Sequence, residues 1–248
     1  MFLFRNIDFS KLFLFSAILL SSPFRPEKNN QYLQFMSLTS SAKNEGNKNY
    51  LALGDSYTIG ESIPASERYP VQTVKMLEAA GIHFNEAEIV ATTGWTTADL
   101  LSAIDKKKFT STYDLVSLLI GVNNQYQGKS KSEYEKEFTR LLQKSIQLAG
   151  DDPAHVIVLS IPDYSVTPFA HGSDVLRIAA EIDAFNLINK KITADFHAHY
   201  INVTEESRKG KDDPSLIAED GLHFSGKEYA LWTGMLVEVI QDIMRNKK

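Results

Sequence analysis

The stretch that decides the fold is YLALGDSYTIGES, residues 50–62. Its apolar run, Tyr50–Leu53, stops at Gly54, and polar residues follow at once. This pattern predicts a short buried strand that ends in a turn. Ser56 then lies just beyond the strand, either as a reactive nucleophile or as an ordinary turn or helix-cap serine. The tripeptide GDS alone is too short to separate these two interpretations.

The composition is that of a globular protein, because 43% of the 248 residues are hydrophobic and 23% are charged. This length suits a single α/β domain with one core. The net charge is −5 without a basic cluster, so we expect no nucleic-acid partner. The chain has no cysteine, which excludes disulfides, thiolate metal sites and a cysteine nucleophile. No feature indicates an obligate protein partner.

The N-terminus, residues 1–22, has the pattern of a secretory signal. Arg5 and Lys11 precede the apolar run Leu12–Leu20, which is too short for a membrane span of about 20 residues. Pro23 stands where cleavage is expected, and no A-x-A-like site is present. We therefore interpret residues 1–22 as a signal peptide or a hydrophobic anchor.

A second interpretation places the start of translation at Met36. We expect an exported protein, periplasmic or secreted, and a cytoplasmic one if translation starts at Met36. Residues 23–49 are polar and rich in Asn, Lys and Ser, which is typical of a disordered linker. The folded domain is expected over residues 50–248.

From Tyr50 onward, strand patterns alternate with helix patterns. The expected strands are 50–53, 88–92, 114–121, 155–162 and 200–203. The expected helices are 70–81, 97–107, 132–150, 176–200 and 228–244. Such alternation predicts an α/β fold in which a mostly parallel sheet of about five strands lies between two layers of helices.

Capping signals set the expected ends of the helices. Thr97 is the expected N-cap of the second helix. Ser132 with Glu135, and Ser225 with Glu228, have the spacing of capping boxes.

Candidate site residues follow the strands, where the ligands of parallel sheets bind. Ser56, Gly94 and Asn123 each come after an expected strand. Beyond a sheet edge, the backbone N–H groups of Ser56 and Gly94 and the side-chain amide of Asn123 are donors suited to an oxyanion hole. A turn glycine and a loop asparagine are the ordinary interpretations of the last two.

A serine nucleophile needs a base, and His223 in EDGLHFSG is the best candidate. Asp220 lies three residues earlier, and Gly221 between them permits a tight turn. That spacing can bring the carboxylate to Nδ1 of the imidazole, which leaves Nε2 to accept the serine proton. The remaining histidines are expected to be structural or exposed; they are His83, His155, His171, His197 and His199.

The segments GDS, TTGW, GVNN and DGLH resemble, in order and rough spacing, the conserved blocks of the GDSL-type (SGNH) hydrolases. The resemblance covers residues 50–248. It implies a flavodoxin-like fold, a triad of Ser56, His223 and Asp220, and an oxyanion hole formed by Ser56, Gly94 and Asn123. The expected activity is hydrolysis of a small or medium acyl ester through an acyl-enzyme, with only the ester and water as partners and with no metal or organic cofactor.

One position departs from the family pattern, because Asn124 stands where an aspartate usually follows the oxyanion asparagine. We expect Asn124 and Tyr126 to shape the substrate pocket. The segment IPDYSVTPFAHG, residues 161–172, follows a strand, and its Tyr164 and Phe169 are expected to line the same pocket. A surface loop with some aromatic packing is the alternative.

Other classes of protein fit less well. Thr58 replaces the second glycine of the G-x-S-x-G elbow of α/β-hydrolases. A phosphate- or flavin-binding protein could use GDSYTIGES at a helix start, but Asp220, His223 and Asn123 would then share no purpose. A non-catalytic binding module on the same fold is the third alternative.

Overall fold

The structure is a computed structural model, and it describes residues 46–245. The expected signal peptide or anchor (1–22) and the linker up to residue 45 lie outside the described residues. Lys48 and Asn49, at the end of the expected linker, are already tied to the fold. Lys48 pairs with Phe84 in a parallel bridge, and the N–H of Asn49 donates to Oδ2 of Asp114 at 2.9 Å. Residues that precede the first strand thus already contact the folded domain.

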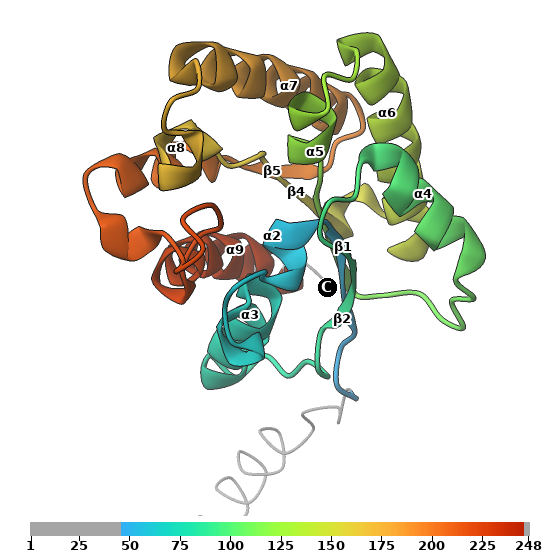
Figure 1. Cartoon of the computed structure of the whole chain (residues 1–248). Helices are drawn as coiled ribbons and strands as arrows, with labels where there is room; N and C mark the ends of the chain where they lie inside the picture. Colours follow the sequence, from blue (N-terminus) through green and yellow to red (C-terminus); the bar gives the residue numbers. More distant parts are fainter. Residues whose placement is uncertain (1–45, 246–248) are drawn as a thin grey trace, which may run out of the picture. The chain divides into compact units, whose positions relative to one another are not determined.

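The centre of the fold is a five-stranded sheet in the order β2-β1-β3-β4-β5, and all neighbouring strands are parallel (Figure 1). The strands are β1 (Tyr50–Gly54), β2 (Glu88–Ala91), β3 (Leu115–Leu119), β4 (Val156–Leu159) and β5 (His199–Ile201). All residues of β1, β3 and β4 are buried, as expected for strands covered on both faces. The predicted fold class is confirmed.

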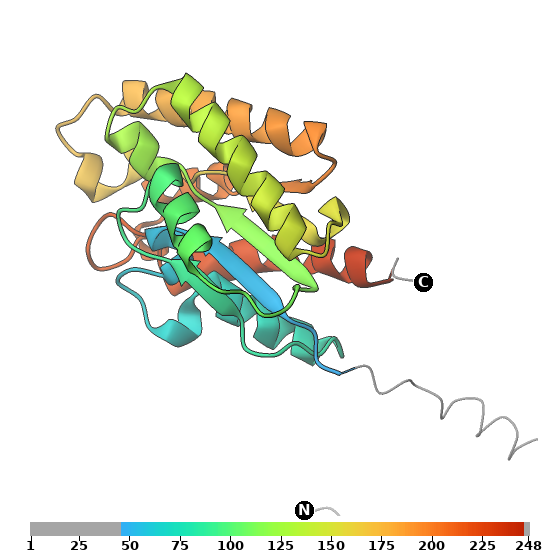
Figure 2. The same cartoon turned by 90° about the vertical axis from the view of Figure 1, so that its right-hand side faces the viewer.

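Helices cover both faces of the sheet (Figure 2). The α-helices are α2 (Ser56–Ile59), α3 (Tyr69–Ala79), α4 (Thr97–Lys106), α5 (Val122–Tyr126), α6 (Lys131–Leu148), α7 (Val175–Asp195), α8 (Thr204–Ser207) and α9 (Gly226–Arg245). The 3₁₀ helices span 65–67, 153–155, 164–166, 168–170, 208–211 and 214–216. Helix α3 packs against α9, and α6 packs against both α4 and α7. Within residues 46–245, no helix is long and apolar enough to cross a membrane.

The strand order creates a switch point between β1 and β3. From β1 the chain passes to β2 on one side, then returns past β1 to β3 on the other. Because parallel crossovers are right-handed, this reversal places α3 and α4 on opposite faces of the sheet. The carboxyl ends of β1 and β3 border the resulting crevice, which is the usual ligand site of such sheets.

Two helix starts differ from their predicted positions. Thr96, not Thr97, caps α4, and its hydroxyl accepts the N–H of the third helical residue at 3.4 Å. Ser130, not Ser132, caps α6 in the same way. At the start of each of these helices, two hydroxyl residues lie within three positions of each other, so the sequence pattern alone does not show which of them is the N-cap. In α4 the tertiary structure decides, because the side chain of Asn124 engages Thr97.

The helix expected over 176–200 ends earlier, at Asp195. His197 adopts a left-handed conformation with φ 59°, and the N–H of Ala198 donates to the carbonyl of Thr193 at 3.1 Å. This 6→1 hydrogen bond is typical of the Schellman ending, which glycine usually supplies. A histidine in that position gives no sequence signal for the end of the helix.

The capping box expected at the start of α9 forms only in part. The hydroxyl of Ser225 accepts the N–H of Glu228 at 3.4 Å. The carboxylate of Glu228 instead lies in the core, where Nε1 of Trp232 donates to it at 2.6 Å. Burial raises the pKa of Glu228 to about 7, although the bond from Trp232 opposes the shift.

Candidate active site

Helix α2 follows directly beyond β1 (Figure 1). Ser56 is its first residue, and the exposed fraction of Ser56 is 5%. Gly54 makes this sharp strand-to-helix turn possible. A Cβ on Gly54 would collide with the side chain of Thr58 and with the carbonyl oxygen of Leu119. The carboxylate of Asp55 caps α2 by accepting the N–H of Tyr57 at 3.1 Å. The glycine and the aspartate of GDS therefore each have a local structural reason.

Asp220 and His223 form a tight acid–base pair. Nδ1 of His223 lies 2.6 Å from Oδ2 of Asp220, which places the proton on Nδ1 and leaves Nε2 as an acceptor. The other carboxylate oxygen accepts the N–H groups of Leu222 and His223, both at 2.9 Å. Gly221 has a φ of 69° and permits the turn. The spacing D-x-x-H thus produces the expected contact.

The carboxyl group of Asp220 is held in its ionised form. Partial burial acts to raise its pKa, but the hydrogen bonds outweigh this effect and hold the pKa well below its ordinary value. The donors are His223, the hydroxyl of Ser62 at 2.7 Å, and the two backbone N–H groups of the turn. An ionised carboxylate in contact with Nδ1 can stabilise an imidazolium.

Gly94 and Asn123 lie beyond β2 and β3. Gly94 has a φ of 85°, and an added Cβ would meet no atom within 4 Å. Its backbone conformation, not a lack of space, is the reason for glycine. Nδ2 of Asn123 donates to the carbonyl oxygen of Trp95 at 2.9 Å. This bond joins α5, the short helix after β3, to the loop that carries Gly94.

A cavity of about 250 Å³ brings the candidates together. It is lined by Ser56, Tyr57, Thr93, Gly94, Val122, Asn123, Tyr126, Tyr164, Phe169, Leu222 and His223. His223 is the one histidine of residues 46–245 in this lining, and it is only 6% exposed. Asp220 lies behind it. Residues 46–245 contain no group of three or more His, Asp or Glu side chains that could hold a metal ion.

The three aromatic residues expected in the pocket do line it, and they contact one another. The ring centroids of Tyr126, Tyr164 and Phe169 lie 6.1 to 6.3 Å apart. They also border a second cavity of about 560 Å³. Polar side chains also line that cavity: Arg177 pairs with Glu181 at 2.9 Å, and Nε2 of Gln125 donates to Glu181 at 2.6 Å.

Asn124 does not line the cavity, and its predicted role in the pocket is corrected. The side chain is 1% exposed. Its Oδ1 accepts the N–H of Thr97 at 3.0 Å, and its Nδ2 donates to Oγ1 of Thr97 at 2.7 Å. The hydroxyl of Thr97 in turn donates to Glu137. Because that hydroxyl has one proton, residue 124 must supply a donor, which Asn does and an ionised Asp does not.

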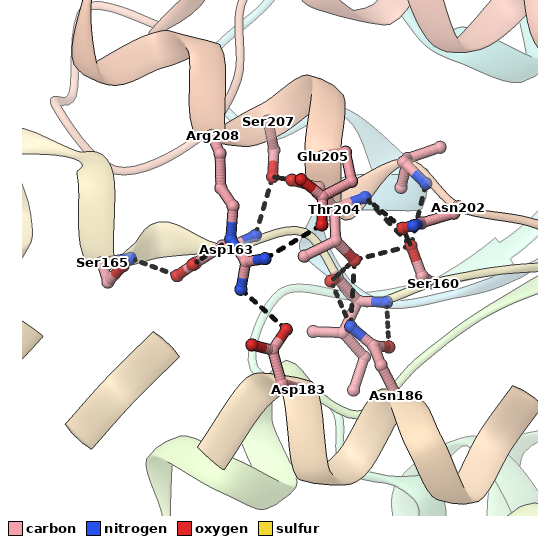
Figure 3. A network of polar contacts seen from close by, with 12 residues as sticks. Ser160, Asp163, Ser165, Asp183, Asn186, Asn202, Thr204, Glu205, Ser207 and Arg208 are labelled. Carbon is pink, nitrogen blue, oxygen red and sulfur yellow. Dashed lines mark hydrogen bonds and ion pairs between the residues drawn. The ribbon is translucent and has the colours of Figure 1, made fainter. Parts of the chain in front are cut away.

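A buried polar network holds the segment that carries Tyr164 and Phe169 (Figure 3). Asp163 is 1% exposed, and Nε of Arg208 donates to its Oδ2 at 2.9 Å. Arg208 also donates to Asp183 of α7 at 2.7 Å. The same segment reaches the acid–base turn, because the N–H of Phe169 donates to the carbonyl of Gly221 at 2.8 Å. The aromatic wall and the Asp220–His223 turn are therefore directly connected.

Comparisons with known proteins agree with this architecture. The model of the GDSL-like Lipase/Acylhydrolase family matches residues 52–231. The lipase/acylhydrolase from Enterococcus faecalis has a similar structure, with 20% identity, a TM-score of 0.60, and coverage of 79% of this chain and 96% of that chain. Axe2, an acetylxylan esterase from Geobacillus stearothermophilus, is also similar in structure, with 19% identity and a TM-score of 0.60. The match covers 79% of this chain and 95% of that chain.

The esterase EstA from Pseudoalteromonas sp. is also similar in structure, with 18% identity, a TM-score of 0.59, and coverage of 81% of this chain and 100% of that chain. A search of curated proteins gave no match. The family model covers well over half of this sequence, and the parallel sheet agrees with the solved structures. The chain belongs to the GDSL-like Lipase/Acylhydrolase family.

Proposed function

We propose that this protein is a serine ester hydrolase in which Ser56 is the nucleophile, His223 the general base and Asp220 the orienting acid. The observation that carries the proposal is the contact of 2.6 Å between Asp220 and His223, with His223 and Ser56 bordering one cavity. Such an arrangement meets the needs of a serine nucleophile, which is weak without a base and an orienting group.

The acylation step uses the free Nε2 of His223. This nitrogen accepts the proton of Ser56 Oγ as the oxygen attacks the ester carbonyl carbon, and the carbonyl oxygen becomes an oxyanion. The backbone N–H groups of Ser56 and Gly94 and the side-chain amide of Asn123 stabilise that charge. The C–O bond to the alcohol then breaks, and His223 returns its proton to the leaving oxygen.

Deacylation repeats the same chemistry with water. His223 accepts a proton from water, the hydroxyl oxygen attacks the acyl-enzyme, and Ser56 Oγ leaves with the proton from His223. Asp220 stays ionised throughout and stabilises the imidazolium. These steps require no metal or organic cofactor.

The two cavities suggest how the substrate lies. The smaller cavity, next to Ser56, suits a small or medium acyl group. The larger one borders the same aromatic rings and has the polar side chains of Gln125, Arg177 and Glu181 in its lining. We propose that the acyl group occupies the first and that a polar alcohol extends into the second. The structural similarity to Axe2, an acetylxylan esterase, supports a short acyl group on a polar alcohol.

Phosphate binding, the alternative function, is disfavoured by Asp55. Its buried carboxylate already accepts the N–H of Tyr57 at the start of α2. An anion bound at the start of this four-residue helix would find that backbone donor already in use.

The test is hydrolysis of p-nitrophenyl esters of graded chain length by the wild type and by Ser56→Ala. We expect turnover that is highest for short or medium acyl chains and is lost in the variant. Full activity in Ser56→Ala would contradict the mechanism, and tight flavin or phosphate binding without turnover would favour the alternative. Export remains a proposal, and N-terminal sequencing of the native protein distinguishes it from a start at Met36.

A further inference from the structure

The turn Gly60–Ser62, which follows α2, is anchored to the nucleophile residue. The N–H groups of Gly60 and Glu61 both donate to the carbonyl oxygen of Ser56, the latter at 3.0 Å. Gly60 has a φ of 68° and Ser62 a φ of 64°. A positive φ is ordinary for glycine but costs free energy for a residue with a Cβ. Ser62 therefore occupies a position at which glycine would be the easier residue.

Two side chains of this turn reach different parts of the site. The carboxylate of Glu61 accepts the hydroxyl of Thr93, the neighbour of Gly94. The hydroxyl of Ser62 donates to Oδ2 of Asp220 at 2.7 Å. The turn thus contacts the helix of the proposed nucleophile, the loop of a proposed oxyanion donor and the acid of the proposed triad. Ser62 and Asp220 are 158 residues apart in the sequence.

We propose that Ser62 is a positioning residue that orients the carboxylate of Asp220 toward His223, and this inference rests on the proposed triad. Oδ1 of Asp220 is held by two backbone N–H groups of its own turn. Oδ2 is held by Nδ1 of His223 and by the hydroxyl of Ser62. Ser62 is the one donor to this carboxylate that comes from outside the turn 220–223 in the described structure. It therefore sets the carboxylate relative to the nucleophile.

The alternative is that Ser62 only shapes an exposed turn. On that account a glycine should serve at least as well, because glycine adopts a positive φ at less cost. On our proposal, by contrast, the hydroxyl and not the backbone is the reason for serine at this position. Both Ser62→Gly and Ser62→Ala remove the hydroxyl, but only glycine suits the backbone. If the hydroxyl matters, both variants lose activity; if only the backbone matters, Ser62→Gly keeps it.

The first experiment measures kcat and KM for ester hydrolysis. We expect kcat to fall roughly tenfold in both variants, with KM within about twofold, as for the loss of one charge-assisted hydrogen bond that matters in the transition state. The matched control is Ser215→Ala, which removes a serine hydroxyl that donates to Asp213 at 2.6 Å, outside the cavity lining. A Ser62→Gly enzyme with wild-type kcat would overturn the proposal.

The second experiment repeats Ser62→Gly in an Asp220→Ala background. If Ser62 acts through Asp220, the double variant should have nearly the same kcat as Asp220→Ala alone. A further tenfold loss would mean that Ser62 acts by another route and would overturn the proposal.

The third measurement does not depend on activity. A ¹³C NMR titration of the Asp220 carboxyl should give a higher pKa in Ser62→Gly than in the wild type, because a donor to the ionised form is lost. An unchanged pKa would overturn the proposal. Full activity in Ser56→Ala would instead contradict the proposed function, whereas an inactive Ser56→Ala with a fully active Ser62→Gly overturns this inference alone.

Discussion

Asn123 and Trp95 are joined by a hydrogen bond of 2.9 Å from the side-chain amide to the backbone carbonyl. An amide has two N–H donors, so this bond fixes the side chain and leaves the second N–H for an oxyanion. It also ties α5, which carries Asn123, to the loop that carries Gly94. The proposed oxyanion donors Gly94 and Asn123 are thereby connected across β1, which separates the strands β2 and β3 that precede them.

We expect Asn123→Ala to lower kcat by about 10²–10³ with little change in KM, because the interaction forms only in the transition state. Steady-state kinetics on one p-nitrophenyl ester measures the effect. Melting temperature serves as the control for folding. A loss confined to KM would assign Asn123 to substrate binding instead.

Asn124→Asp is expected to destabilise the protein by about 2 kcal/mol, because the aspartate is buried and no longer donates to Thr97. Glu137→Gln should rescue much of this loss. The amide introduced at position 137 can donate to the hydroxyl of Thr97, which is then free to donate to the new carboxylate. Urea unfolding of the two single variants and the double variant measures the coupling. Additive effects would rule out this account of Asn124.

Arg208→Met should destabilise the fold by about 3 kcal/mol, since the carboxylate of Asp163 would stay buried without its cation (Figure 3). KM should rise as well, because the segment with Tyr164 and Phe169 loses an anchor. The matched control is Arg245→Met, which removes an exposed pair with Asp242 and should cost no more than about 0.5 kcal/mol. Chemical denaturation measures the free energy of unfolding of both variants. Equal losses of stability in Arg208→Met and Arg245→Met would contradict the prediction.

Asp55→Asn should change how stability depends on pH. Burial raises the pKa of Asp55 from 3.8 to about 7, against the opposing effect of backbone N–H donors. Because the folded pKa lies above the unfolded one, the neutral carboxyl contributes stability that is complete below about pH 4 and is lost as the pH rises to about 7. The loss is at most about 4 kcal/mol. Asparagine stays neutral and can still accept the N–H of Tyr57.

Urea unfolding at about pH 5 and about pH 8 tests this expectation. The wild type should lose more stability between the two values than Asp55→Asn does. Glu228, whose pKa is also raised to about 7, contributes a slope of the same sign in both proteins and cancels in the comparison. Equal losses in the two proteins would show that Asp55 ionises normally.

The sequence predicts the strands well because their signal is local. A continuous apolar run such as Leu115–Leu119 can be buried on both faces only in the centre of a sheet. The acid–base pair is predictable for the same reason, since a D-x-x-H turn brings Asp220 to His223 within four residues. Helix ends are less certain, because at Thr96 and Thr97 two neighbouring hydroxyls compete for one cap.

The sequence by itself thus determined the α/β class, the edge of the sheet that carries the site and the identity of most residues around the cavity. Only the tertiary structure decided that Asn124 is buried against Thr97 and that Ser62 reaches Asp220. Both contacts join segments far apart in the chain, and neither residue carries a periodic or capping signal for its partner. Side-chain hydrogen bonds across such separations depend on how the loops pack beyond the sheet, which no local pattern encodes.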